Sequence, residues 1–268
     1  MRNRQVQAND QTPQPGRLIV SPPGEGGWNM ALDQALLEQV QADSIPVLRF
    51  YRWSMPTLSL GYFQNLADRA RHTPSREIPV VRRSTGGGAI IHDQELTYSL
   101  CLPLSDRFSR SLTSVYGAAH DAIIAATAEL GIKLTRFADS DPPTNRLATG
   151  QQPASEPFLC FQRRTADDLV FSGYKLVGSA QRRSAHALLQ HGGILLRASR
   201  FAPELPGLQE LSAKPIVPTD FISHVTRWLA DELNIHWGED AVPSETLQNA
   251  KAILKNRFQT RNWTERRP

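Results

Sequence analysis

Apolar and polar residues alternate along the chain with two periods, one typical of strands and one typical of helices. A helix is expected at residues 29–40, where apolar positions recur about once per turn and Asn29 can serve as N-cap. A second helix at residues 112–130 has the same spacing through Val115, Ala119 and Ile123. Strand-like patterns occupy residues 17–21, 47–53, 57–63, 96–102, 134–137, 169–171, 174–180 and 187–196.

The remaining patterns complete an α+β arrangement. Residues 79–92 are typical of two strands joined by a glycine turn, and the strands between residues 169 and 196 are typical of a meander. Helices follow at residues 220–233 and 244–258, the second with Ser244 as expected N-cap. Because strands gather in hairpins with helices between them, we expect a mixed, largely antiparallel sheet with flanking helices.

The same patterns divide the chain into three parts. Residues 1–16 are polar, contain proline and lack periodicity, so a frayed tail is expected there. The strand-rich part spans residues 17–200, and residues 201–268 form a mainly helical extension expected to pack on the same domain. Residues 139–157 are polar and long for an internal loop, and they are either disordered or a mobile flap beside a site.

Composition limits the cellular setting. The chain has 268 residues, 40% of them hydrophobic, which is enough for one core of ordinary size. No apolar run approaches the roughly 20 residues of a membrane span, and the polar segment after Arg4 does not fit a secretory signal. We therefore expect a cytoplasmic protein that does not bind a membrane.

Charge and cysteine content limit its partners further. The net charge of +4 suits an acidic partner protein or serves solubility alone. Nucleic acid is not expected, because no basic stripe interleaved with aromatic residues is visible. Cys101 and Cys160 can form no disulfide framework and lack the spacing of zinc ligands. Both are expected to be free thiols, Cys101 in the core, and no metal site is expected.

The densest chemical signal is the segment 82–93. Its three consecutive glycines at 86–88 leave backbone N–H groups unshielded, so a ligand can lie against the main chain. Alone, a triple glycine is more often a strand bulge or a tight turn. The arginines Arg82 and Arg83, which can hold an anionic group, and the following His92 favour the ligand site. The segment matches neither the phosphate loop nor the dinucleotide fingerprint.

Two later segments add candidate residues. Lys175 stands in an apolar strand pattern, where its ammonium either pairs with a carboxylate or faces a ligand; a strand lysine by itself is more often a solvated edge residue. His191 interrupts another apolar strand and, by itself, fits a hydrogen-bonded structural histidine. Neither residue indicates a function by itself, so the order of these motifs along the chain is the stronger signal.

In this order and spacing, the three motifs resemble the family of lipoate–protein ligases and lipoyl-pathway octanoyltransferases, relatives of biotin–protein ligases. The likeness extends to residues 29–33, 50–53 and 56–64, and it marks residues 17–200 as the catalytic domain. It implies a biotin/lipoate protein ligase-like fold in which the acyl chain lies in a tunnel beside the glycine segment and Lys175.

The family contains two chemistries. Ligases activate free lipoate with ATP as lipoyl-AMP, whereas transferases take octanoate from a thioester on acyl carrier protein. Cys160, fifteen residues before Lys175, resembles the nucleophile of the Gram-positive type of cysteine octanoyltransferase, and Glu95 stands where ligases usually have glycine. Gly88 departs from this pattern, because transferases often have arginine there. The resemblance therefore implies an octanoyltransferase, with the ATP-dependent lipoate–protein ligase as the alternative.

The implied mechanism has two steps. Cys160 accepts the octanoyl group as a thioester and passes it to a lysine of a lipoyl carrier domain. Lys175 stabilises the thiolate or accepts a proton from the incoming amine, and backbone N–H groups near Gly178 stabilise the oxyanion. The substrate-binding residues implied are Arg82, Arg83, Ser84, Thr85, Gly86, Gly87, Gly88, His92, Gly178, Ser179, Ala180, His191 and Gly192.

The implied partners are octanoyl-acyl carrier protein and a lipoyl domain, either the glycine-cleavage H protein or a dehydrogenase E2. No cofactor is implied; ATP and Mg²⁺ enter only with the ligase alternative. A non-catalytic protein that binds acyl groups or lipoyl domains is a further alternative, and it predicts that Lys175 is dispensable. A biotin–protein ligase fits less well, because that branch usually carries a Gly-Arg-Gly type of loop.

Overall fold

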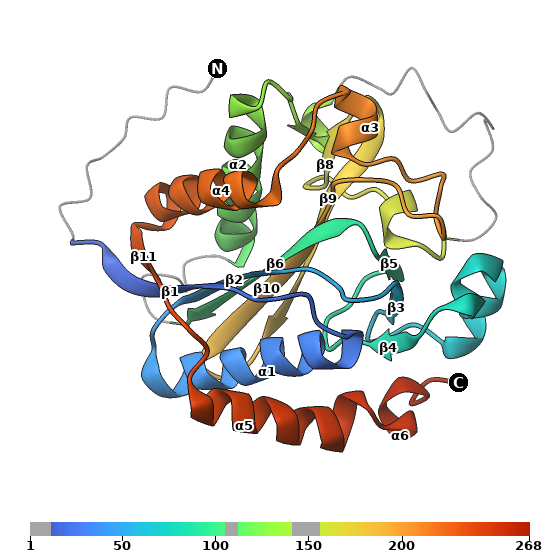
Figure 1. The fold of residues 1–268 in the computed structure, drawn as a ribbon, viewed down its shortest axis with the longest axis horizontal. Coiled ribbons are helices and arrows are strands. Elements are labelled where there is room, and N and C mark those ends of the chain that lie inside the picture. Colours follow the sequence, from blue (N-terminus) through green and yellow to red (C-terminus); the bar gives the residue numbers. More distant parts are fainter. Residues whose placement is uncertain (1–11, 105–111, 141–155) are drawn as a thin grey trace.

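The structure is a computed structural model that describes residues 12–104, 112–140 and 156–268. Its helices and strands follow one another along the chain as β1 (Gln14–Val20), α1 (Gly26–Asp43), β2 (Val47–Tyr51), β3 (Thr57–Leu60), β4 (Val80–Arg82), β5 (Ile90–His92), β6 (Glu95–Pro103), α2 (Leu112–Glu129), β7 (Thr135–Arg136), β8 (Leu169–Phe171), β9 (Tyr174–Arg183), β10 (Ala187–Leu195), α3 (Leu208–Ser212), α4 (Pro218–Leu233), β11 (Ile235–Glu239), α5 (Ser244–Ile253) and α6 (Arg261–Thr264) (Figure 1).

The main sheet has eight strands in the order β11-β1-β2-β6-β10-β9-β8-β7. The pairs β11–β1 and β1–β2 are parallel, and every other neighbouring pair is antiparallel. Strands β8, β9 and β10 form the expected meander. The prediction of a mixed, largely antiparallel sheet in an α+β fold is confirmed.

A second, three-stranded sheet has the order β4-β3-β5. The two strands expected within residues 79–92 therefore exist but do not pair with each other. Strand β3 lies between them, parallel to β4 and antiparallel to β5. The glycine segment thus passes over the end of β3 instead of closing a hairpin, and the residues just before it contact β9 and β10 of the main sheet.

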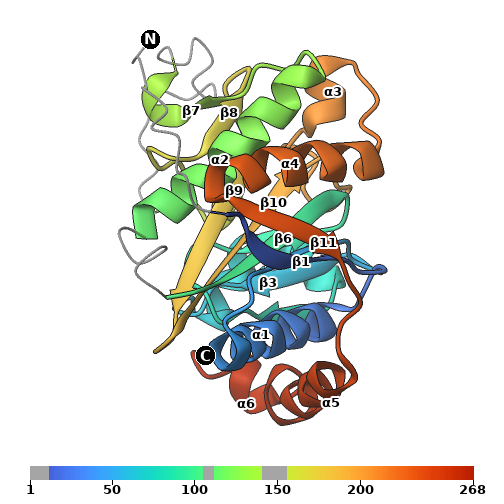
Figure 2. The same cartoon turned by 90° about the vertical axis from the view of Figure 1, so that its left-hand side faces the viewer.

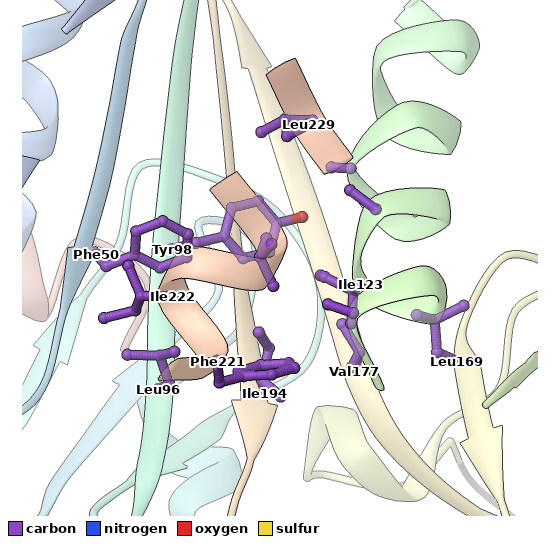
Figure 3. Packing of buried hydrophobic residues seen from close by; sticks show 14 of the residues in the cluster. Phe50, Leu96, Tyr98, Ile123, Leu169, Val177, Ile194, Phe221, Ile222 and Leu229 are labelled. Atoms are coloured by element: carbon purple, nitrogen blue, oxygen red, sulfur yellow. The ribbon is translucent and has the colours of Figure 1, made fainter. Parts of the chain in front are cut away.

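Helices cover both faces of the main sheet. Helices α1 and α5 pack together on one face with α6 beside them, and α2 and α4 pack together on the other (Figures 1 and 2). On the second face, Phe50 and Tyr98 from the sheet meet Ile123 of α2 and Phe221 of α4 in one buried cluster (Figure 3). Each such fully buried side chain contributes about 1.5–3 kcal/mol, so this layer stabilises the packing of α2 and α4 on the sheet.

Two expected helix caps were wrong. Helix α1 begins at Gly26 with Glu25 as N-cap, so Asn29 lies inside the helix. Its side chain instead joins α1 to the sheet, since its amide donates to the carbonyl of Arg52 and its oxygen accepts from Arg49. Helix α5 has Pro243 as N-cap and begins at Ser244, without a side-chain cap. The Asn29 side chain thus forms hydrogen bonds to residues distant in the sequence and does not cap the helix.

Most of the expected N-terminal tail, residues 1–11 of 1–16, lies outside the described residues. Strand β1 starts at Gln14, earlier than expected, because β11 pairs with it from Ile235 onward. The part after residue 200 therefore adds a strand to the main sheet as well as helices α3 to α6. Residues 141–155 of the expected flap lie outside the described residues, and the three-part division stays a prediction.

Candidate active site

Cys160 lies directly beside the glycine segment. The backbone N–H of Cys160 donates to the carbonyl of Ala89 at 2.7 Å, and the N–H of Ala89 donates to Phe158 at 3.0 Å, which forms a short parallel bridge. A Cβ on Gly88 would lie 3.0 Å from the Cα of Cys160 and 2.7 Å from the Arg163 side chain. Only glycine at position 88 allows this approach, and an arginine there would require the Cys160 segment to move.

Lys175 reaches the same point from strand β9. Its Nζ lies 3.8 Å from the Sγ of Cys160 and 3.3 Å from the Cys160 carbonyl oxygen. The lysine side chain is buried, whereas Cys160 is partly exposed. A charged ammonium thus lies within contact of an accessible thiol, which is the geometry that the expected chemistry requires.

Asp168 holds the Lys175 ammonium in place. Its Oδ1 lies 2.9 Å from Nζ, and both side chains are 3% exposed or less. The other carboxylate oxygen accepts from the N–H of Thr165 at 2.7 Å. No role was expected for Asp168 from the sequence. Its position directly before a strand that pairs with β9 was the one available signal, because such a pair places a carboxylate near the lysine.

A pocket of about 450 Å³, including its open mouth, begins at Cys160 and the glycine segment. Its inner part is lined by Met30, Tyr51 and Trp53, which are all buried. Gly87 is exposed at the mouth. Of the expected site residues, those that line the pocket are Arg83, Gly86, Gly87, His92, Cys160, Gly178, Ser179, Ala180, His191 and Gly192. The walls are mainly apolar inside and polar at the mouth, as suits a chain with a reactive head group.

The expected residues outside this lining have other contacts. Arg82 is not part of the pocket lining and donates to the carbonyls of Gly61, Gln64 and Thr264. Ser84 accepts through its carbonyl from Arg182, and Thr85 bonds to His191. Arg82 thus connects the segment after β3 to the C-terminal residues through hydrogen bonds.

Arg83 shapes the glycine segment from inside. Its guanidinium donates to the carbonyl of Ser59 at 3.1 Å and to the carbonyls of Gly86 and Gly88 at 2.6 and 2.8 Å. Burial lowers the pKa of Arg83 to about 10, so the group is still a cation at neutral pH. The carbonyls of the glycine segment therefore turn toward Arg83, which stabilises the curved path of the backbone.

His92 belongs to a buried chain of hydrogen bonds. Its Nδ1 lies 2.5 Å from the Oε1 of Glu95, and its Nε2 lies 2.8 Å from the Oγ of Ser59. The imidazole also stacks on Trp53 at 3.7 Å between ring centroids. Burial lowers the pKa of His92 although Glu95 opposes this shift, so the ring is neutral at pH 7. It forms a fixed inner wall together with Trp53.

His191 lies between the glycine segment and a second buried group. Its Nε2 lies 2.6 Å from the Thr85 hydroxyl, and its Nδ1 faces Asp33 at 3.5 Å. Asp33 also accepts from Arg49 and Tyr51. Burial by itself would raise the pKa of Asp33, but the charge of Arg49 and these hydrogen bonds hold it below its ordinary value. Asp33 was not among the residues expected from the sequence, because helix α1 contributes it from far along the chain.

Ser179 connects the pocket to helix α2. Its hydroxyl lies 2.7 Å from the hydroxyl of Tyr98 and 2.8 Å from the Nε2 of His120. His120 is held by the carbonyl of Asp167 at 2.7 Å, and burial lowers its pKa to about 4. A neutral His120 accepts from Ser179, so this wall of the pocket is uncharged.

Within the part of the chain that the structure describes, no group of three or more His, Cys, Asp or Glu side chains could hold a metal ion. No helix among these residues is both long and apolar enough to cross a membrane.

The chain is similar to known proteins over most of its length. The lipoyl protein ligase A/B catalytic domain family matches residues 25–220. Proteins named octanoyltransferase LipM from Lysinibacillus sphaericus and Brevibacillus brevis are 31% and 28% identical; they cover 88% and 94% of this chain, which in turn covers 93% and 99% of theirs.

Solved structures share the fold. A bipartite lipoate protein ligase from Thermoplasma acidophilum, described with its E2 lipoyl domain, has a TM-score of 0.72 at 20% identity and covers 94% of this chain and 96% of its own. A lipoate–protein ligase A bound with ATP has a TM-score of 0.74 at 20% identity, with 94% and 99% covered. The expected resemblance is confirmed, and the chain belongs to the lipoyl protein ligase A/B catalytic domain family.

Proposed function

We propose that this enzyme is an octanoyltransferase of protein lipoylation, which moves octanoate from octanoyl-acyl carrier protein through a thioester on Cys160 to a lysine of a lipoyl domain. The observation that carries the proposal is the contact of 3.8 Å between the Lys175 ammonium and the Cys160 thiol at the mouth of a pocket. The names of the relatives, which are octanoyltransferases, support the same reaction.

In the first step, the thiolate of Cys160 attacks the carbonyl carbon of the donor thioester. A new C–S bond forms, the bond to the donor sulfur breaks, and the donor thiolate takes up a proton as it leaves. The Lys175 ammonium stabilises the attacking thiolate because of its charge and its short distance. Asp168 keeps this ammonium oriented while the thioester exchange takes place.

In the second step, the neutral amine of the acceptor lysine attacks the Cys160 thioester. An amide C–N bond forms, the C–S bond to Cys160 breaks and its sulfur leaves as thiolate, and the amine proton passes to water. A thioester is already activated toward an amine, so the reaction consumes no ATP. The enzyme returns to its starting state with Lys175 again facing a thiolate.

The pocket suits a medium-length acyl chain. Met30, Tyr51 and Trp53 offer apolar surface at its inner end, and the histidine at position 92 is neutral there. An uncharged chain loses little by entering such a space, because no ionised group must be stripped of water without a partner. The octanoyl tail would lie inward and the thioester carbonyl at Cys160.

Intact-protein mass spectrometry tests the proposal. The wild-type enzyme, incubated with octanoyl-acyl carrier protein and no ATP, should gain one octanoyl group. Cys160→Ala should gain none, and the control Cys101→Ala should gain one, since Cys101 is buried in β6. A gain that persists in Cys160→Ala would refute the thioester. Lipoyl-domain modification from free lipoate that requires ATP and Mg²⁺ and survives Cys160→Ala would instead establish a ligase.

A further inference from the structure

A group of arginines and aromatic rings lies beside the pocket mouth. Phe63 is 65% exposed, and its ring would lie 3.8 Å from a Cβ on Gly86, which lines the pocket. Tyr62 packs edge-on against Phe63 at 4.9 Å between centroids. We call the surface formed by these rings, by Trp263 and by four arginines the arginine–aromatic face; the arginines are Arg182, Arg257, Arg266 and Arg267.

Separate parts of the chain build this face. Arg266 lies 4.1 Å above the ring of Tyr62, and Arg267 lies 5.5 Å from the ring of Phe63. Helix α6 is held against β4 because the indole of Trp263 donates to the carbonyl of Arg82 at 2.7 Å (Figure 1). Arg182 on β9 donates to the carbonyl of Ser84, next to the glycine segment. The face is therefore continuous with the mouth of the pocket.

The positive charge of this face is only weakly offset by nearby carboxylates. Among the described residues, none of its four arginines forms an ion pair. The nearby Glu38 accepts from Gln34 and Asn249, and Glu265 pairs with Arg261. Burial and then the like charges of Arg257 and Arg266 lower the pKa of Arg182, although Tyr62 and Glu38 oppose this shift. Cations held close together without carboxylates in ion pairs attract an anionic partner.

We propose that the arginine–aromatic face is the docking surface for the acidic carrier protein that delivers the acyl thioester, with the phosphodiester of its prosthetic arm among Arg182, Arg266 and Arg267. The inference rests on the proposed function. The donor brings an anionic arm to Cys160, whereas the acceptor brings a lysine that carries no such anionic group. The guanidinium groups of Arg266 and Arg267 lie over the rings of Tyr62 and Phe63. These rings are therefore less available for stacking with nucleic-acid bases.

The test compares two donors, octanoyl-acyl carrier protein and octanoyl-pantetheine, which lacks both the carrier and the phosphate. The double variant Arg266→Gln/Arg267→Gln should lose about tenfold in the kcat/KM of Cys160 acylation by the carrier donor and nothing with octanoyl-pantetheine. Arg182→Gln should show a smaller loss of the same kind. The loss should shrink at high salt, where the wild-type enzyme also slows. The matched control is Arg227→Gln on α4, at the other face of the sheet.

Four results would overturn the inference. These are wild-type rates for both variants with the carrier donor, an equal loss with both donors, a raised KM for the lipoyl-domain acceptor alone, and competition by a single-stranded oligonucleotide stronger than that of the carrier. The proposed function is tested separately, because octanoyl-acyl carrier protein must acylate wild-type Cys160 and not Cys160→Ala whatever the role of this face. If wild-type Cys160 gains no octanoyl group from either donor, the thioester mechanism is refuted, whereas a loss confined to the arginine variants concerns the docking surface alone.

Discussion

Replacing Lys175 by methionine separates the two roles that the structure gives this residue. Methionine keeps much of the side-chain volume and removes the charge. The variant leaves the Asp168 carboxylate 2% exposed without its cation and leaves the Cys160 thiolate without its ammonium. The first effect should reduce stability, and the second should reduce the rate of acylation.

Both magnitudes follow from the geometry. Removing one partner of a buried ion pair costs about 3–5 kcal/mol, because the remaining charge is buried alone. Charges 3.8 Å apart interact by about 4 kcal/mol at an effective dielectric constant of about 20. Asp168, on the far side of the ammonium, offsets part of this attraction. We therefore expect a loss of about a hundredfold in the acylation rate, which corresponds to about 2.7 kcal/mol.

The double variant Lys175→Met/Asp168→Asn separates the two effects. Asparagine can still accept from the N–H of Thr165, and neither side chain of the former pair carries a charge. Urea unfolding should show that most of the lost stability returns, since neutral replacements for buried pairs are well tolerated. Rapid-quench mass spectrometry with octanoyl-pantetheine should show acylation as slow as in Lys175→Met. Recovery of the rate together with the stability would refute a catalytic role for Lys175 and leave it a structural one.

Two further predictions concern the surroundings of the site. Burial lowers the pKa of His120 to about 4, below the value of about 6.5 in an unfolded chain, so the unfolded state binds the proton first as the pH falls. The free energy of unfolding should drop by about 3 kcal/mol between pH 6.5 and 4 through this residue, and urea titrations of His120→Gln should show a flatter pH dependence. In Gly61→Ala, the new Cβ would lie 2.0 Å from the carbonyl oxygen of Gly87, so thermal unfolding should show a loss of about 1–3 kcal/mol and acylation should slow. Gly86→Ala, whose Cβ has no neighbour closer than 3.8 Å, is the stability control; an equal loss there would contradict the steric reasoning.

Local pattern determined most of the elements. Helix α2 and strands β6, β9 and β10 fall where the apolar spacing predicted them, because a face that must be buried imposes its period on the sequence. The glycine segment and the pair Cys160 and Lys175 were also visible, since rare residue types in a fixed order are informative without coordinates. The contact between Cys160 and Lys175 was an expectation from family resemblance, which the geometry meets.

Tertiary structure decided which partners these residues have. Arg82 and Arg83 are adjacent in the sequence, yet one binds the end of the chain and the other binds the glycine carbonyls. Asp168 acquires its role only because the pairing of β8 with β9 brings it to Lys175. The arginine–aromatic face forms where the segment after β3, the end of β9 and α6 meet. Periodicity determines which face of an element is buried, but long-range packing determines what that face touches, so these contacts could not be predicted from the sequence alone.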